Sequence, residues 1–139
     1  MSTALTDILN AHPQHSDLDM QLLTDCLETC GACVQACTAC ADACLGEQWS
    51  ADLVENVRAM LDCADICAAT GRVLARLGGA RTSVAVTMLE ACVAACRACQ
   101  ATCGATDEAP GSGTHSAACE LTCARCAEVC ERLLASLRV

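Results

Sequence analysis

Cysteine dominates the chemistry available to this chain, with 16 thiols among 139 residues. Thiolates coordinate soft metal ions, act as nucleophiles or redox-active dithiols, and pair as disulfides. Most of the cysteines fall into runs whose spacing alternates between four and three residues. The runs are Cys26, Cys30, Cys33, Cys37, Cys40 and Cys44; Cys92, Cys96, Cys99 and Cys103; Cys119, Cys123, Cys126 and Cys130; and the shortened copy Cys63 and Cys67.

The alternating spacing averages about 3.5 residues, the repeat of positions that face partner helices in a helical bundle. In the first run, the opposite positions carry Glu28, Gln35 and Asp42, as expected for a solvent-exposed face. Residues flanking the thiols, such as Ala36 and Ala95, are small and leave volume around the sulfurs. The pattern therefore predicts that all 16 thiols point inward.

Four long helices with short connections are the elements expected to position these thiols. They span about Asp17 to Leu45, with Ser16 as N-cap and Gly46 as the stop; from after Ser50 through Arg76 to Gly78 and Gly79; about Thr82 to Thr102, ending near Gly104; and from near Thr114 or Ser116 almost to Val139. A short extra helix is expected over residues 4–11, broken before Pro13. The predicted fold is all-α, an antiparallel up-down-up-down four-helix bundle with a cysteine-lined core. We expect an N-terminal tail or short helix over residues 1–15 and the bundle domain over 16–139.

Charge and composition exclude several classes of partner. The net charge of −9 argues against nucleic acid, because phosphate contacts need clustered Lys and Arg. The N-terminus lacks the basic and apolar pattern of a secretion signal. Charged residues such as Glu90 and Arg97 are expected to interrupt each apolar stretch before it reaches the ~20 residues of a membrane span. We therefore expect a cytoplasmic protein, in a compartment where structural disulfides are rare.

Several uses of inward thiols compete at this point. Cysteine packs as a small hydrophobe, but Leu, Ile and Val would bury more area without oxidising. Disulfides between helices are an alternative that free-thiol counting would test, whereas i and i+4 thiols on one helix are poorly oriented for pairing. No cysteine precedes a proline, unlike common iron–sulfur motifs. Four separate zinc–tetrathiolate sites would leave about eight negative charges in the interior. Cu(I) selects thiolates, and one Cu⁺ for each thiolate gives a neutral core.

The repeated Cys-x-x-x-Cys-x-x-Cys-x-x-x-Cys pattern resembles the bacterial copper storage proteins, over about Leu18 to Leu137. The resemblance implies a cytosolic, non-catalytic four-helix bundle that holds many Cu(I) ions and assembles into homotetramers. It also implies that the Cys-x-x-x-Cys pairs form most of the sites. These pairs are Cys26/Cys30, Cys33/Cys37, Cys40/Cys44, Cys63/Cys67, Cys92/Cys96, Cys99/Cys103, Cys119/Cys123 and Cys126/Cys130.

The two ends of the predicted bundle differ in composition. One end carries leucines on core positions, a dry plug formed by Leu23, Leu74, Leu77, Leu89, Leu133 and Leu137, with Met88 packing beside it. The other end carries Cys44, Cys103 and Cys119 together with Met60, Asn56 and His115. Thioether and imidazole groups are soft enough to pass Cu(I) to the first thiols, so we expect copper to enter here with Met60, Asn56 and His115 as further ligands. The alternatives are that Met60 is a core filler, that Asn56 tolerates a wet bundle end or fixes register, and that His115 is a solvated residue at a helix start. His12 and His15, on the N-terminal tail, are expected to have no such role.

The predicted function is storage and detoxification of cytosolic Cu(I), with a copper chaperone as a candidate partner. The alternative is a general thiol-rich sink for zinc or cadmium, similar in role to metallothionein. A dithiol redox enzyme is disfavoured, because no single exposed, activated pair is distinguished from the rest.

Overall fold

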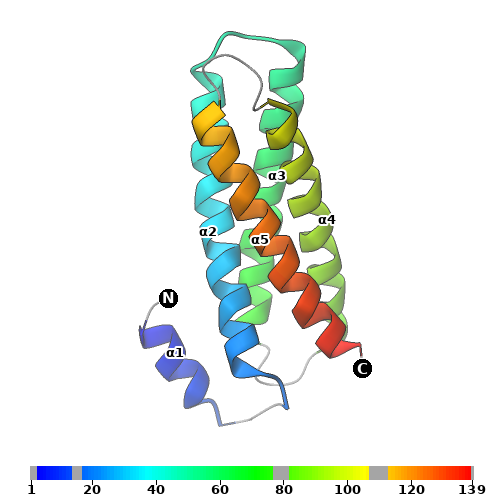
Figure 1. Cartoon of the computed structure of the whole chain (residues 1–139). Helices are drawn as coiled ribbons and strands as arrows, with labels where there is room; N and C mark the ends of the chain where they lie inside the picture. The colour runs from blue at the N-terminus through cyan, green and yellow to red at the C-terminus, as the bar shows by residue number, and fades with distance from the viewer. Residues whose placement is uncertain (1–2, 14–16, 77–81, 107–112, 139) are drawn as a thin grey trace.

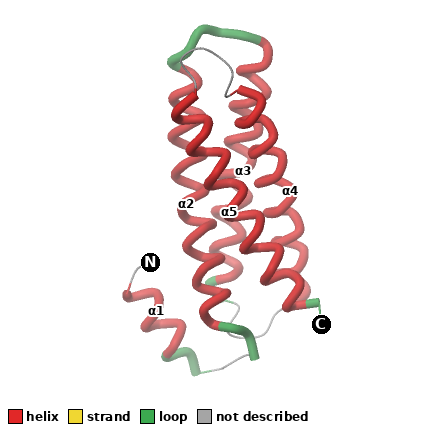
Figure 2. The backbone as a smooth tube through the Cα atoms, viewed as in Figure 1, coloured by secondary structure: helices red, strands yellow, loops and turns green. Residues whose placement is uncertain are grey.

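The structure is a computed structural model that describes residues 3–13, 17–76, 82–106 and 113–138. It contains α1 (Thr3–Asn10), α2 (Met20–Leu45), α3 (Ala51–Leu74), α4 (Thr82–Thr106) and α5 (Gly113–Leu137), and within the described residues every regular element is helical (Figure 2). The four long helices run up, down, up and down (Figure 1). Each packs against its neighbours in chain order, and α5 closes the bundle against α2. The predicted all-α antiparallel bundle with an extra N-terminal helix is confirmed.

Capping residues set the start of α2 and α3. The carboxylate of Asp19 accepts hydrogen bonds from the backbone N–H groups of Gln21 (3.0 Å) and Leu22 (3.3 Å), so α2 begins at Met20 rather than near Asp17. The predicted cap Ser16 lies outside the described residues. The hydroxyl of Ser50 accepts from the N–H of Leu53 at 3.1 Å, which confirms the predicted start of α3.

The predicted helix stops have mixed outcomes. Gly46 follows the last residue of α2 and donates its N–H to the Ala43 carbonyl at 3.1 Å, as expected for a stop. The α3 helix ends at Leu74, and the Gly78–Gly79 pair lies outside the described residues. The α4 helix ends at Thr106, two residues beyond Gly104, near the position predicted for its end. A Cβ at position 104 would lie 3.1 Å from the Glu120 carboxylate of α5, so this glycine allows close packing between helices.

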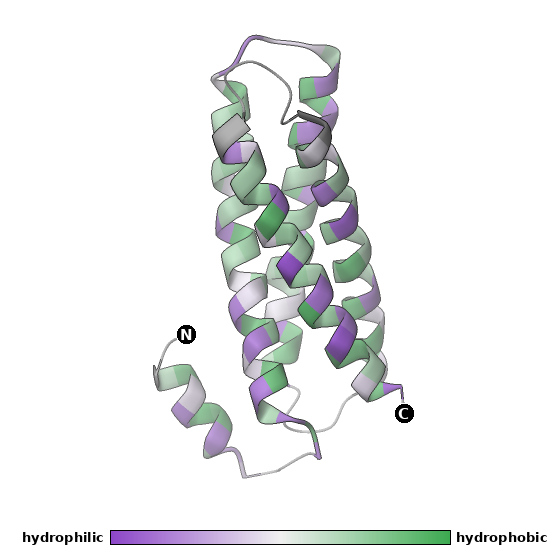
Figure 3. Cartoon of the chain, viewed as in Figure 1, coloured by the Kyte–Doolittle hydropathy of each residue, from purple (hydrophilic) through white to green (hydrophobic). Residues whose placement is uncertain are grey.

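The α4 helix is more apolar than expected, because charged residues were predicted to interrupt every stretch long enough to span a membrane. Its segment Ser83–Gly104 is long and apolar enough by composition to cross a membrane, with a mean hydropathy of 1.4, although Glu90 and Arg97 lie within it. The four cysteines of this helix are fully buried in the bundle. Arg97 pairs with Glu131 of α5 (3.1 Å), and Glu90 pairs with Arg138, the residue after the end of α5 (3.0 Å). Figure 3 shows such hydrophilic residues along the visible outer faces of α4 and α5. This is the pattern of an amphipathic helix packed within a bundle.

Leucines close the end of the bundle opposite the α2–α3 connection. Leu23, Leu74, Leu89 and Leu133 each have no exposed surface, and together they bring one leucine from each long helix. Leu137 is half-buried, as is Met88, and Leu77 lies outside the described residues. The predicted apolar plug is therefore present at this end.

Candidate metal-binding core

All 16 cysteines are free thiols buried inside the bundle. None exposes more than 3% of its surface. The helices place them there because the spacing of four and three residues keeps each run on the face that meets the other helices. The prediction of inward thiols is confirmed, and the alternative of disulfide staples finds no support in this arrangement.

The sulfurs form a continuous ladder of four-sulfur groups along the bundle axis. In each group, all sulfur atoms lie within 4.8 Å of one another. Four of these groups are Cys30, Cys92, Cys126 and Cys130; Cys33, Cys67, Cys96 and Cys126; Cys33, Cys37, Cys63 and Cys123; and Cys37, Cys99, Cys119 and Cys123. These four groups contain twelve different cysteines, because four of the cysteines belong to two groups each: Cys33, Cys37, Cys123 and Cys126. Neighbouring groups are therefore joined through shared sulfurs.

Contacts between helices in this ladder are as short as contacts within a helix. The Sγ atom of Cys33 lies 3.6 Å from that of Cys63 and 3.7 Å from that of Cys123, on two other helices. Its distance to the Cys37 sulfur, one turn further along α2, is 3.8 Å. The Cys-x-x-x-Cys pairs therefore lie within a network that joins all four helices, and their separate role as copper sites stays a prediction.

Burial favours the protonated form of the thiol nearest the open end of the ladder in the apo protein. At the open end of the ladder, burial raises the pKa of the Cys44 thiol above its ordinary value, and the nearby charge of Glu47 raises it further. A thiolate is the form that binds a metal ion, so binding must release a proton from such a group.

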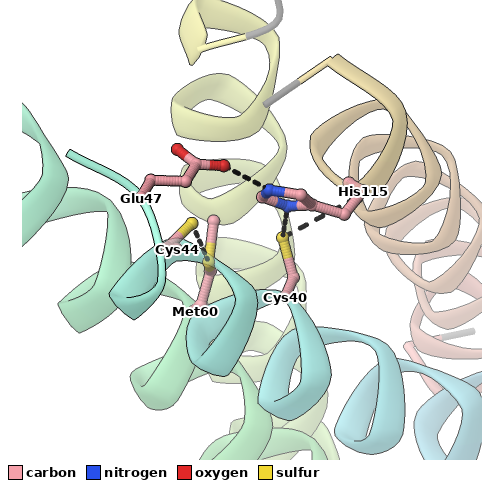
Figure 4. A network of polar contacts seen from close by, with 5 residues as sticks. All are labelled: Cys40, Cys44, Glu47, Met60 and His115. Atoms are coloured by element: carbon pink, nitrogen blue, oxygen red, sulfur yellow. Dashed lines mark hydrogen bonds and ion pairs between the residues drawn. The ribbon is translucent and has the colours of Figure 1, made fainter. Parts of the chain in front are cut away.

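The ladder reaches the end formed by the α2–α3 connection through Cys40 and Cys44, and we call this end the mouth (Figure 4). His115, in the first turns of α5, directs its Nδ1 atom to the Cys40 Sγ at 3.2 Å. The Sγ atoms of Cys40 and Cys44 and a ring nitrogen of His115 lie within 4.8 Å of one another. The His115 side chain is 25% exposed, so it connects solvent with the buried thiols.

Met60 and Asn56, both on α3, lie at the same end. The Met60 side chain is fully buried, and its Sδ atom lies 4.0 Å from the Cys44 Sγ. Asn56 is only 6% exposed, and its side-chain amide has no hydrogen-bond partner among the residues that the structure describes. Buried amides ordinarily have a hydrogen-bond partner. Because Asn56 lacks one among the described residues, its side-chain oxygen is available to a ligand.

Sequence reasoning missed Glu47, which lies in the α2–α3 connection. Its carboxylate oxygen Oε1 lies 2.5 Å from Nε2 of His115, on the side of the ring away from Cys40 (Figure 4). The two residues are 68 positions apart, and no local pattern links them. In the sequence, the one feature that could have pointed to Glu47 is its position as an acidic residue just beyond a helix end.

The fold and the sulfur ladder define a four-helix bundle built to bind soft metal ions. This chain belongs to the copper storage protein family, whose sequence model matches residues 19–135. No curated protein sequence matches the chain significantly.

Solved structures from Streptomyces lividans are similar to the chain over most of its length. The copper storage protein Ccsp loaded with 10 copper equivalents is 39% identical, with a TM-score of 0.87 over 94% of this chain and 98% of that one. A Ccsp variant with a single histidine replaced by alanine is 41% identical, with a TM-score of 0.81 over 88% of this chain and 99% of that one. A cytosolic copper storage protein studied at five coppers is also 41% identical, with a TM-score of 0.77 over 83% and 93% of the two chains.

Proposed function

We propose that this protein stores copper in the cytosol as Cu(I) ions bound to the thiolates of its core cysteines. The observation that carries the proposal is the ladder of four-sulfur groups joined through shared sulfurs. Its membership of the copper storage family and its likeness to copper-loaded and cytosolic relatives support the same function. We assign the storage unit to residues 16–139 and a separate tail or short helix to residues 1–15.

Charge balance favours Cu(I) over zinc or cadmium. Four divalent ions in the four groups would leave about four uncompensated negative charges among the twelve thiolates, whereas one Cu⁺ for each thiolate leaves none. Cu(I) is also the ion that prefers soft sulfur ligands. A general zinc or cadmium sink therefore remains the second candidate, favoured only by the presence of the four-sulfur groups themselves.

We further propose that Cu(I) enters at the mouth, where His115, Met60 and Asn56 act as ligands beside Cys40 and Cys44. The partly exposed imidazole beside Cys40 supports this role for His115, and the contact with Cys44 supports it for Met60. The unpartnered buried amide supports it for Asn56. The leucine plug makes the opposite end unsuitable, because its fully buried apolar side chains offer an ion no ligand atom.

A non-catalytic role fits the burial of the thiols. A redox enzyme needs a dithiol that substrates can reach, and here every cysteine is at least 97% buried. The resemblance to the family also implies a homotetramer, and a copper chaperone is a candidate donor. Light scattering of the purified protein would test the tetramer, and transfer from a Cu(I)-loaded donor protein would test the chaperone.

Anaerobic titration with Cu(I) against a competing chelator tests the storage function. We expect a capacity of about one ion for each thiol, about 16 to 20 per chain, and little displacement by excess Zn²⁺. Displacement of bound Cu(I) by Zn²⁺ would contradict the proposal and favour the general sink.

A matched pair of variants relates this capacity to the ladder. Cys37 belongs to two four-sulfur groups, whereas the Cys26 thiol donates a hydrogen bond to the Val129 carbonyl at 3.5 Å. We expect Cys37→Ser to lose more Cu(I) capacity than Cys26→Ser. Equal losses would mean that the shared sulfurs do not organise the bound ions.

A further inference from the structure

The contact between Glu47 and His115 joins two parts of the mouth that are remote in sequence. Glu47 lies two residues beyond the end of α2, whereas His115 is near the start of α5. Each side chain is 25% exposed. The imidazole is thus held between a carboxylate at Nε2 and the Cys40 sulfur at Nδ1 (Figure 4).

The carboxylate determines which nitrogen of His115 faces the thiols with a lone pair. A neutral imidazole carries one N–H and one unprotonated nitrogen, and an ionised carboxylate can only accept a hydrogen bond. For a neutral ring beside an ionised carboxylate, Nε2 donates its hydrogen to Glu47 and the lone pair lies on Nδ1, whose distance to the Cys40 Sγ is 3.2 Å. A metal ion binds through that lone pair, so the arrangement presents Nδ1 as the ligand atom.

We propose that Glu47 is a positioning residue that fixes the ring orientation and tautomer of His115, so that Nδ1 is presented to incoming Cu(I) beside Cys40. Carboxylates that hold the second nitrogen of a metal-binding histidine have this effect in many metal sites. The inference rests on the proposed entrance of copper at the mouth. Without Glu47, the ring can rotate and offer Nε2 or neither nitrogen to the same position.

Substitutions of Glu47 separate positioning from attraction of the cation by negative charge. Glu47→Ala removes both the hydrogen-bond acceptor and the charge, whereas Glu47→Gln removes the charge and keeps an acceptor oxygen at the same reach. The matched control is Glu55→Ala on α3, because Glu55 is an exposed carboxylate whose ion pair is with Arg58, at 3.5 Å. All three variants lower the negative charge by one unit.

Stopped-flow mixing with a Cu(I) complex measures uptake of the first ions. We expect Glu47→Ala to slow it by about tenfold, a typical cost of losing a partner of a metal-binding histidine. Glu47→Gln should retain most of the wild-type rate, Glu55→Ala all of it, and total capacity should not change. Equal slowing by the alanine and glutamine variants would overturn positioning and indicate charge attraction.

Nitrogen-15 NMR of the histidine rings in the apo protein tests the same proposal without copper. We expect His115 to show one defined tautomer, with hydrogen on Nε2, in the wild type and in Glu47→Gln, and averaged signals in Glu47→Ala. An unchanged ring spectrum in Glu47→Ala would overturn the inference. If copper enters elsewhere, His115→Ala will leave the uptake rate unchanged, but the NMR result will still hold. Failure of the proposed entrance can therefore be distinguished from failure of the positioning role of Glu47.

Discussion

The mouth and the leucine plug are built from the same four helices but use opposite chemistry. At the plug lie four fully buried leucines, whose side chains carry no atom that could bind an ion. At the mouth, the imidazole of His115, the thioether of Met60 and the amide of Asn56 replace them beside the last thiols. The difference fits the proposed entrance of Cu(I) at the mouth and gives the plug the role of an ordinary apolar core.

The largest effect on stability is expected at the plug. Leu133→Ala should lower the free energy of unfolding of the apo protein by about 2–5 kcal/mol, because it removes a fully buried side chain and leaves a cavity. Chemical denaturation measures this loss. The initial rate of Cu(I) uptake should remain as in the wild type, and slower uptake would contradict the assignment of the plug to stability alone.

A smaller effect on energy, but a specific one on rate, is expected at the mouth. His115→Ala should slow uptake of the first Cu(I) ions by about tenfold, because it removes a soft ligand that reaches from solvent to Cys40. Total capacity should stay nearly intact, and the unfolding free energy should change far less than in Leu133→Ala. An uptake rate equal to that of the wild type would remove His115 from the loading path.

The smallest expected effect is on the pH dependence of apo stability. It distinguishes the mouth, where Cys44 can lose a proton, from the plug, whose leucines cannot. The raised pKa of Cys44 means that the unfolded chain loses this proton first as the pH rises through the ordinary thiol value of 9.0. Apo stability should therefore be constant with respect to this thiol below about pH 9 and fall above it, as thermal unfolding would show. Replacing Cys44 by Ala should flatten that fall, whereas Leu133→Ala should leave its slope unchanged.

Copper binding should have the opposite dependence on pH. Each thiol must lose its proton to bind Cu(I), so binding weakens as the pH falls. Competition with a chelator of known pH dependence measures this trend. Binding that strengthens on acidification would be incompatible with thiolate ligands.

The sequence predicted the features that depend on local periodicity. The spacing of cysteines places every sulfur inside whatever bundle the helices form, because a 3.5-residue repeat has only one face. The leucines follow the same repeat, so the closed end could be predicted as well. Ser50 and Gly46 also act as expected, since caps are local features.

The features that sequence reasoning missed depend on contacts between remote segments. Gly104 has the composition of a helix stop, yet the approach of Glu120 from α5 gives it a packing role within α4. Glu47 looks like an ordinary exposed acid until α5 brings His115 against it. Which sulfurs share a group also depends on the relative heights of the helices, which spacing along one helix does not determine.

The shared sulfurs of the ladder, together with its single proposed entrance, have a consequence for the order in which ions bind and leave. An ion can advance by exchanging one sulfur at a time, because Cys33, Cys37, Cys123 and Cys126 each belong to two successive groups. With entry at the proposed mouth, the ions bound last would lie nearest the solvent and leave first, so a partly filled protein would release its most recently bound copper before the rest.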